Sequence, residues 1–452
     1  MKANLKKQVL LFLVVLLIGG LGYGIYYIST LAPVITGYAA KNLASGVFVG
    51  NRTQESMEQN DLNFSFIKYN KNTVDFQNKE VISRFLWFSS KAVYVEGFGC
   101  TLLRDVDQET IKSRKFPTIE PDTIDASLTP WPAGDLLSDT LPKGINIEIL
   151  NRALDSAFSN NVGSKGTYAV AVSYKNQLIS ERYQNGFTSK NRFLSWSMAK
   201  SFTNAIAGIM VKKGMLNIDE QVELQGRENT TGITFRNLMN MNSGLEWNED
   251  YGNLSDVTLM LYKEKDMGTF SWTKKPLQKP DSVWYYSSGT TNIACKYIRQ
   301  KFNSDDEYFK FPYTELFNKT GMRSIVWETD ATGTLLGSSY LYASLRDYVR
   351  FGLLYLNNGV WFGNRILPEN WVNISTTEVK GSNGKYGAFF WLNKSKSYPN
   401  VPDDMYFCQG HDGQFIYIIP SLKLVVVRVG FSKKGEFNAQ KFLENVVKAV
   451  EN

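Results

Sequence analysis

The sequence is poor in the residues that usually bind metals. It has one histidine, His411, and three cysteines, Cys100, Cys295 and Cys408, among 452 residues. A single imidazole excludes zinc sites built on two or three histidines. The cysteines lie far apart without a C-x-x-C pair, which argues against a thiolate metal site. We therefore expect neither a metal nor an organic cofactor. The odd cysteine count also argues against a disulfide-stapled scaffold, although it leaves one bridge open.

Long blocks of like charge are also absent. The chain has 50 Lys and Arg against 43 Asp and Glu, a net charge of +7, and three lysines within the first seven residues account for part of the excess. We find no Lys/Arg block of the kind that binds nucleic acid, so nucleic acid is not an expected partner. The hydrophobic content of 43% is that of an ordinary globular protein, and the length predicts two or three lobes.

Charge is missing altogether from residues 8–40, and residues 9–28 are apolar apart from glycine and tyrosine. Twenty residues of helix extend about 30 Å, enough to cross the core of a bilayer. Three lysines precede this run and tyrosines lie near its far end, the pattern of a membrane anchor with its N-terminus in the cytoplasm. We predict a membrane partner through residues 9–28, with the rest of the chain extracytoplasmic, either periplasmic or extracellular.

A cleaved signal peptide is the alternative. The apolar run exceeds the 7–15 residues that are usual for signal peptides. Gly37, Tyr38 and Ala39 form a small-x-small sequence that a signal peptidase could cut, although it lies far downstream. A cleaved, secreted form is therefore left open.

Three regions follow from the patterning. Residues 1–30 form the anchor or signal segment. Residues 31–143 form an N-terminal extension with short strands, predicted at 64–69 and 92–95, and a Pro-rich linker that holds five of the 13 prolines within residues 117–142. Residues 144–452 form the third region, and the role of residues 41–113 is left open.

The third region starts and ends with regular elements. The apolar spacing predicts helices at 147–158, 198–213 and 437–450, and strands at 168–174, 178–183, 415–419 and 424–431. The stretch up to about residue 375 is mostly helical and rich in loops. We predict an α+β fold in which one antiparallel sheet, built from both ends of this region, is flanked by terminal helices and carries an inserted, mainly helical lobe.

The pattern S-x-x-K occurs four times, at Ser65, Ser197, Ser271 and Ser382. Only Ser197 opens an amphipathic helix, where residues i and i+3 are about 5–6 Å apart and Ser197 can meet Lys200. Burial and the helix dipole lower the pKa of such a lysine, which can then take the serine proton. The first turn also offers a free N–H group for an oxyanion. A capping serine beside a solvated lysine is the alternative interpretation.

Two further stretches have polar groups of catalytic type. Tyr286 lies in the sequence WYYSSG, and His411, Gly413 and Gln414 lie in GHDGQ, directly before a predicted strand. A tyrosine can relay a proton to a leaving group, and glycines let a substrate approach the backbone closely. Each stretch is weak on its own.

The order of the three motifs resembles that of the serine β-lactamase and penicillin-binding-protein superfamily, in which S-x-x-K, Y-x-N and K-T-G or H-x-G follow one another. The chain looks closest to the class C-like branch, which includes esterases and 6-aminohexanoate-dimer hydrolases. The stretches LNIDEQV, ITFRNLMNMNSGLEW, LYASLRDYVRFGLLYLNNGVWFGNRILPENWV and YAAKNLASGVFVGNR are similar to passages of that branch. The resemblance covers nearly everything after the anchor and implies that residues 144–452 form a β-lactamase-like serine hydrolase domain.

The resemblance implies roles for particular residues. Ser197 corresponds to the acylated nucleophile, Lys200 to its base and Tyr286 to a second proton-transfer group. His411 and Gly413 hold third-motif positions, and the N–H groups of Ser197 and Gln414 correspond to the oxyanion hole. The second motif departs from the family pattern, because Ser288 stands where the superfamily often has asparagine.

The third motif has His411 where many relatives have lysine. Histidine is mostly neutral at pH 7, whereas lysine is a permanent cation suited to the carboxylate of a β-lactam or a peptide. We therefore expect an exported serine hydrolase that cleaves esters or small amides, with weak or no β-lactamase activity. The substrate would be a small molecule or peptide-like. The alternatives are a cell-wall D-alanyl carboxypeptidase resembling penicillin-binding proteins and a non-catalytic envelope binding protein of the same fold.

Overall fold

A six-stranded antiparallel sheet forms the centre of the fold in the computed structural model, which describes residues 2–120, 124–224 and 232–450. Its strand order is β12-β13-β14-β15-β5-β6. The strands are β5 (Thr167–Tyr174), β6 (Gln177–Tyr183), β12 (Trp391–Leu392), β13 (Tyr406–Gly410), β14 (Gln414–Ile419) and β15 (Leu424–Gly430). Strands from the start and the end of the predicted third region pair directly, because β5 lies beside β15. The predicted sheet built from both ends is confirmed.

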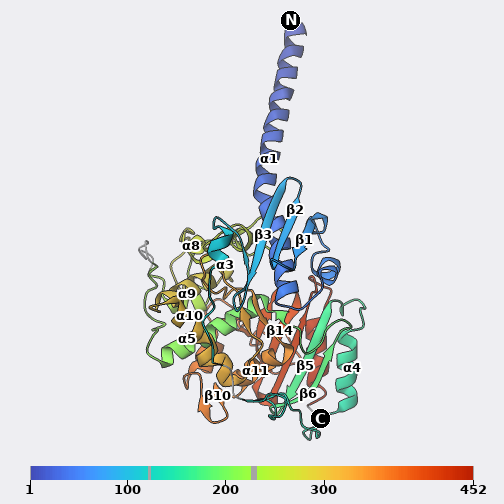
Figure 1. The fold of residues 1–452 in the computed structure, drawn as a ribbon, viewed down its shortest axis with the longest axis vertical. Helices are drawn as coiled ribbons and strands as arrows, with labels where there is room; N and C mark the ends of the chain where they lie inside the picture. The colour runs from blue at the N-terminus through green and yellow to red at the C-terminus, as the bar shows by residue number, and fades with distance from the viewer. Residues whose placement is uncertain (1, 121–123, 225–231, 451–452) are drawn as a thin grey trace.

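Helices cover both faces of this sheet (Figure 1). Alternate residues of β15 point to opposite sides, so that Val426 packs with α4 (Ile147–Ala157) and α13 (Ala439–Val447), while Val425 packs toward α11 (Leu345–Leu356). Because both faces are covered, the strand is a nearly continuous apolar run. The terminal helices predicted beside the sheet are therefore present.

The inserted lobe is mainly helical and lies between β6 and β12. Its helices are α5 (Ala199–Lys212), α6 (Phe235–Met239), α7 (Asp256–Tyr262), α8 (Met267–Trp272), α9 (Ser288–Gln300), α10 (Asp305–Pro312), α11 and α12 (Trp371–Thr376), with shorter turns η3 (Trp196–Met198), η4 (Tyr313–Phe317) and η5 (Asn318–Thr320). Its small strands are β7 (Phe193–Leu194), β8 (Val326–Trp327), β9 (Leu341–Ala343), β10 (Val360–Trp361) and β11 (Asn364–Arg365). Turns η6 (His411–Gly413) and η7 (Pro420–Leu422) join the late strands of the main sheet.

The N-terminal part is built around one long helix, α1 (Lys2–Phe48). Its outer half stands away from the rest of the protein, whereas its inner half is buried (Figure 1). A four-stranded sheet packs against the inner half: β1 (Lys71–Asp75), β2 (Glu80–Phe85), β3 (Phe88–Val95) and β4 (Gly99–Leu102). Short helices α2 (Gln54–Ser56), η1 (Met57–Asp61), η2 (Ile67–Tyr69) and α3 (Gln108–Lys112) complete this part. The helix is long and apolar enough to cross a membrane.

A buried ion pair joins α1 to the inserted lobe. Lys41 contacts Glu328, which follows β8, and neither side chain is more than 3% exposed. Ser45 donates a hydrogen bond of 2.9 Å to the same carboxylate, and the backbone N–H of Cys100 donates another of 2.6 Å. Desolvation raises the pKa of Glu328, and Lys41 opposes that effect. Helix α1, the N-terminal sheet and the lobe therefore each contribute groups to one buried polar cluster around Glu328.

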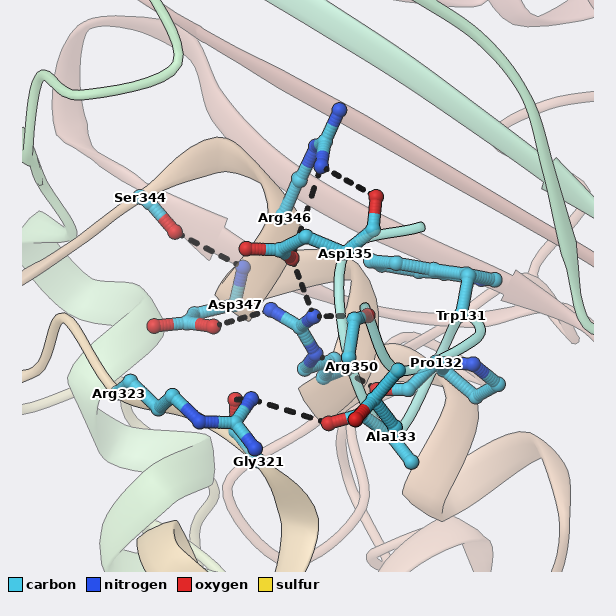
Figure 2. A network of polar contacts seen from close by, with 12 residues as sticks. Trp131, Pro132, Ala133, Asp135, Gly321, Arg323, Ser344, Arg346, Asp347 and Arg350 are labelled. Carbon is cyan, nitrogen blue, oxygen red and sulfur yellow. Dashed lines mark hydrogen bonds and ion pairs between the residues drawn. The ribbon is translucent and has the colours of Figure 1, made fainter. Parts of the chain in front are cut away.

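The Pro-rich passage is docked onto α11 rather than loose (Figure 2). The guanidinium group of Arg350 donates to the carbonyl oxygens of Pro132 (2.9 Å) and Gly134 (2.7 Å), and it pairs with Asp135 (2.6 Å) and Asp347 (2.8 Å). Pro121 lies outside the described residues. The passage thus reaches the helix that covers the central sheet.

The structure corrects one predicted strand. Residues 64–69 form a turn followed by η2, because Ser65 has a positive φ of 45° that breaks the extended run. The strand predicted at residues 64–69, which includes Ser65, is therefore wrong. The strand predicted at 92–95 is confirmed within β3. All three cysteines are buried and free, so the bridge left open above is not formed.

Candidate active site

Ser197 lies at the junction between the central sheet and the helical lobe. It sits in η3, one turn before α5, and this turn packs against β13 and β14. The Nζ atom of Lys200 is 3.0 Å from the Oγ atom of Ser197. The predicted pairing of i and i+3 is therefore present, although Ser197 precedes the α-helix instead of opening it.

The environment of Lys200 favours its neutral form. The side chain is buried, and desolvation lowers its pKa to about 8, with Glu249 acting in the opposite direction. The same amine lies 3.0 Å from the Oγ atom of Ser288 and 3.4 Å from the carbonyl oxygen of Ser338. About a tenth of Lys200 is then uncharged at pH 7 and about half at pH 8, far more than for an ordinary lysine, and a base for Ser197 requires this neutral form.

Ser288 links the lysine to a carboxylate. Its hydroxyl donates to Oε1 of Glu249 and its backbone N–H donates to Oε2 at 2.9 Å. The indole N–H of Trp247 also donates to this carboxylate. The first residue of α9 therefore forms a bridge between Lys200 and Glu249. This bridge gives Ser288, the departure in the second motif, a definite role in the local network.

Tyr286, rather than its neighbour, faces the lysine. The Nζ atom of Lys200 lies 4.8 Å from the centre of the Tyr286 ring, whereas Tyr285 is 53% exposed. The ring of Tyr286 stacks on Trp391 at 5.3 Å. Burial and the charge of Glu249 raise the pKa of Tyr286, and a hydrogen bond with Ser197 acts in the opposite direction. Its phenol keeps its proton and can donate it.

The third motif forms the tight connection between β13 and β14. Gly410 pairs with Gln414 across this connection. Gly413 has a φ of +89°, and a Cβ atom there would lie 2.3 Å from the guanidinium group of Arg428, so any other residue would strain the backbone and displace that group. The side chain of Gln414 is held by the carbonyl oxygen of His411 (3.1 Å) and by the N–H of Gly430 (2.9 Å). The Gln414 side chain is therefore engaged within the protein, and the predicted role of this residue would rest on its backbone N–H group.

His411 is packed between aromatic rings and is neutral. Its ring lies 4.3 Å from that of Tyr251 and 5.3 Å from that of Trp196. Desolvation lowers the pKa of His411 to about 4, although 36% of its side chain is exposed. The lowered pKa agrees with the expectation that His411 does not carry a permanent positive charge.

Trp196, which precedes the nucleophile candidate, has a strained backbone with a φ of +46°. Its indole is buried and packs against the rings of Tyr38, Tyr251, Tyr340 and His411. Strain of this kind persists where the surroundings over-determine it, and it clusters at functional sites. The aromatic rings thus hold the turn that presents Ser197.

The sequence missed several members of this cluster. It identified Ser197, Lys200, Tyr286 and the third motif, and the structure gathers them around η3 and β13. It gave no role to Glu249, Tyr251 or Trp196. Glu249 and Tyr251 lie just beyond the stretch ITFRNLMNMNSGLEW, and nothing in their spacing shows that they fold back onto α9. Within the described residues, no group of three or more His, Cys, Asp or Glu side chains could hold a metal ion.

Known proteins share this arrangement of elements. The family described as Beta-lactamase matches residues 154–446. A curated 6-aminohexanoate-dimer hydrolase of Paenarthrobacter ureafaciens is 22% identical over 227 residues, which cover 46% of this chain and 56% of that protein. The match thus spans little more than half the length of that relative.

Solved structures agree on the fold. A Bacillus anthracis protein provisionally named 6-aminohexanoate-dimer hydrolase superposes with a TM-score of 0.56 at 23% identity, over 65% of this chain and 80% of that chain. A penicillin binding protein from Bacillus halodurans superposes with a TM-score of 0.51 at 14% identity, over 67% and 99%. At these identities the likeness shows the fold alone. The resemblance drawn from the three motifs is confirmed.

Proposed function

The chain belongs to the beta-lactamase family, and on that premise we propose that it is a serine hydrolase that cleaves an ester or amide bond through a Ser197 acyl-enzyme. The observation that carries the proposal is the buried pair of Ser197 and Lys200, 3.0 Å apart, with a lysine pKa lowered to about 8. Lys41 is buried against a carboxylate partner, whereas Lys200 contacts two hydroxyl groups and a carbonyl oxygen. Burial in such surroundings favours the neutral amine that a general base needs.

The groups present support each step of acyl transfer. Neutral Lys200 takes the proton of Ser197 as Oγ bonds to the substrate carbonyl carbon. The negative charge on the carbonyl oxygen would be held by the N–H groups of Ser197 and Gln414. When the bond to the leaving group breaks, a proton passes to that group through Tyr286, whose raised pKa keeps it protonated. Water then releases the acyl group and restores Ser197.

Glu249 and Ser288 stabilise the intermediate state of this cycle. Once Lys200 has taken the proton it is an ammonium ion in a buried site, where an unpaired charge is unfavourable. The carboxylate of Glu249, bridged through the hydroxyl of Ser288, favours that charged form. The bridge thus stabilises the positive charge that develops on Lys200 during acylation.

The neutral state of His411 favours uncharged substrates. A β-lactam or a peptide C-terminus brings a carboxylate to the third motif, and a neutral imidazole offers it a hydrogen bond but no opposite charge. We propose esters or small amides as substrates, with weak β-lactam turnover.

We also propose that α1 anchors the protein in a membrane, with the catalytic part extracytoplasmic. Residues 9–28 are exposed and apolar in this helix, and three lysines precede them. Gly37 and Ala39, where a signal peptidase could cut, are buried inside the continuous helix. Removal of the preceding segment would therefore disrupt packed structure, which favours an uncleaved anchor. Carbonate extraction of membranes and protease protection in intact cells test this placement.

A fluorescent fluorophosphonate probe tests the nucleophile directly. We expect the full-length protein to be labelled, Ser197→Ala to remain unlabelled, and Ser382→Ala, which removes the serine of another S-x-x-K sequence, to be labelled as wild type. Labelling of Ser197→Ala at the wild-type rate, or no labelling of the wild type by this probe and by a fluorescent penicillin, would refute the assignment and leave a binding protein as the better interpretation.

A further inference from the structure

A cavity of about 370 Å³ lies between α1 and the third motif. This volume is within the range of small-molecule sites. Much of the wall is apolar and includes Leu31, Val34, Ile35, Phe64, Phe66 and Leu254. Polar and charged side chains line the rest, among them Ser65, Asn253, Thr258, Asp412, Lys433 and Lys434. Tyr251 and His411 also line the cavity, and we call the part beside them its inner end. The cavity thus runs beside the helix that could cross a membrane.

The inner end of the cavity belongs to the candidate active site. The rings of Tyr251 and His411 stack at 4.3 Å, and both contact Trp196, the residue before Ser197. The hydroxyl of Tyr251 is 3.5 Å from Glu249 on the other side. A chain in the cavity would therefore end against the residues that surround the nucleophile.

The outer end of the cavity reaches the level at which α1 leaves the rest of the protein. Strand β3 runs alongside α1 in the same direction, because Ser90 bonds Thr36 at 2.7 Å and Tyr94 packs on Phe48. Trp87, three residues before Ser90, lies about 10 Å further toward the outer half of the helix. That distance equals about six or seven helical residues, which brings Trp87 to the level of residues 29–30.

Exposed apolar side chains gather at this level. Leu86 and Trp87, at the tip of the β2–β3 hairpin that rises beside α1 in Figure 1, are 60% and 73% exposed, and Phe66 is 55% exposed. Tyr27, near the end of the apolar run, is part of the cavity wall. Aromatic side chains at such a level are typical of the boundary between lipid and water. The part of the cavity lined by Tyr27 and Phe66 therefore lies at the level where the bilayer surface would be.

We propose that the substrate is an ester or amide with a long acyl chain, taken from the membrane surface, with its chain in this cavity and its carbonyl at Ser197. This rests on the hydrolase function proposed above. The apolar side chains beside α1 suit a hydrocarbon chain, whereas amide groups of a peptide packed against this part of the wall would be left unpaired. In the acyl-enzyme the chain stays in the cavity, the alcohol or amine departs with a proton, and water releases the fatty acid.

The test keeps the leaving group constant and changes only the chain. The full-length protein, reconstituted in phosphatidylcholine vesicles, is given p-nitrophenyl acetate and p-nitrophenyl dodecanoate. Leu254→Trp and Leu31→Trp fill the cavity from two different elements, and Val162→Trp adds the same ring at a site that is 95% exposed and does not line the cavity. The measured quantity is the ratio of kcat/KM for dodecanoate to that for acetate.

We expect the wild type to prefer dodecanoate, and each cavity variant to lower the ratio by about tenfold or more, since pocket contacts of a few methylene groups discriminate to that degree. Val162→Trp should keep the wild-type ratio. Two results would overturn this inference and leave the hydrolase proposal standing, provided that acetate hydrolysis depends on Ser197. One is a wild type that does not prefer dodecanoate, and the other is a ratio that neither cavity variant changes. Faster cleavage of a soluble D-alanyl peptide, reduced by the same cavity variants, also overturns it. Hydrolysis of neither ester and no labelling of Ser197 would refute the hydrolase proposal itself.

Discussion

Replacement of Glu249 by glutamine should shift the pH dependence of acylation to lower pH. The carboxylate raises the pKa of Lys200, against the desolvation that lowers it to about 8. Ser288 bridges the two groups, with 3.0 Å between its Oγ atom and the amine and a short hydrogen bond to the carboxylate. In Glu249→Gln the bridge can persist while the charge is lost.

The size of the shift follows from the separation. The bridge places the carboxylate about 5 Å from the ammonium group, where a unit charge contributes roughly 1–3 kcal/mol between aqueous and protein-like dielectrics. Because Glu249 is partly exposed, we take the lower half of that range, which is about one pKa unit. The midpoint should therefore fall from about 8 to about 7, since loss of a nearby negative charge makes the neutral lysine easier to form.

The assay is the rate of fluorophosphonate labelling of Ser197 between about pH 6 and pH 10, on both sides of the lysine midpoint. The rate rises with pH as Lys200 loses its proton. In the variant the rise should come earlier, and the plateau should be lower because the ammonium formed during acylation has lost its counter-charge. Glu246→Gln, an exposed carboxylate on the same loop, serves as the matched control and should keep the wild-type midpoint. A midpoint that stays in place or rises in Glu249→Gln would show that Lys200 is not the titrating base or is not coupled to Glu249.

Three further variants test separate parts of the structure. Lys200→Met should abolish labelling while circular dichroism shows the wild-type fold, and labelling at the wild-type rate would mean that another base serves. Trp196→Ala removes a buried indole and should lower the free energy of unfolding, measured by urea denaturation, by about 3–5 kcal/mol. Labelling of Ser197 should also slow because the turn loses its support, and an unchanged labelling rate would contradict that role of Trp196. Arg350→Met should cost about 3–5 kcal/mol in the same denaturation assay, because buried Asp347 loses its cation, although it keeps its hydrogen bonds from Ser324. Arg152→Met, at an exposed position of α4, should change the free energy of unfolding little, and equal effects of the two variants would contradict the importance of the docked linker.

The sequence predicted those features that depend on local spacing. The sheet strands and the flanking helices follow from apolar periodicity, and Ser197 and Lys200 meet because three residues of helix bring them together. The third motif could be located because glycines bracket it. In contrast, the strand expected at residues 64–69 was wrong, since its alternation of apolar residues is also compatible with a turn stabilised by packing against Tyr38 and Phe431.

The contacts that the sequence could not predict join residues far apart in the chain. Glu249 reaches Ser288 across 39 residues, and Trp196 meets His411 only when β13 folds beside η3. A carboxylate in a loop has the same sequence signature whether it is solvated or bridged to a lysine. The burial of the inner half of α1 was equally hidden, because the apolar residues of a membrane segment and of a core helix look alike.

The ion pair between Lys41 and Glu328 has a consequence for the order of folding during synthesis. Lys41 is made early, with the helix that would enter the membrane, while its partner emerges 287 residues later. Until then, burial of the lysine would leave an uncompensated charge, which is strongly unfavourable. We therefore expect the N-terminal sheet to stay open, with Lys41 in water, until the helical lobe has left the ribosome. The pairing would then close both parts in one late step.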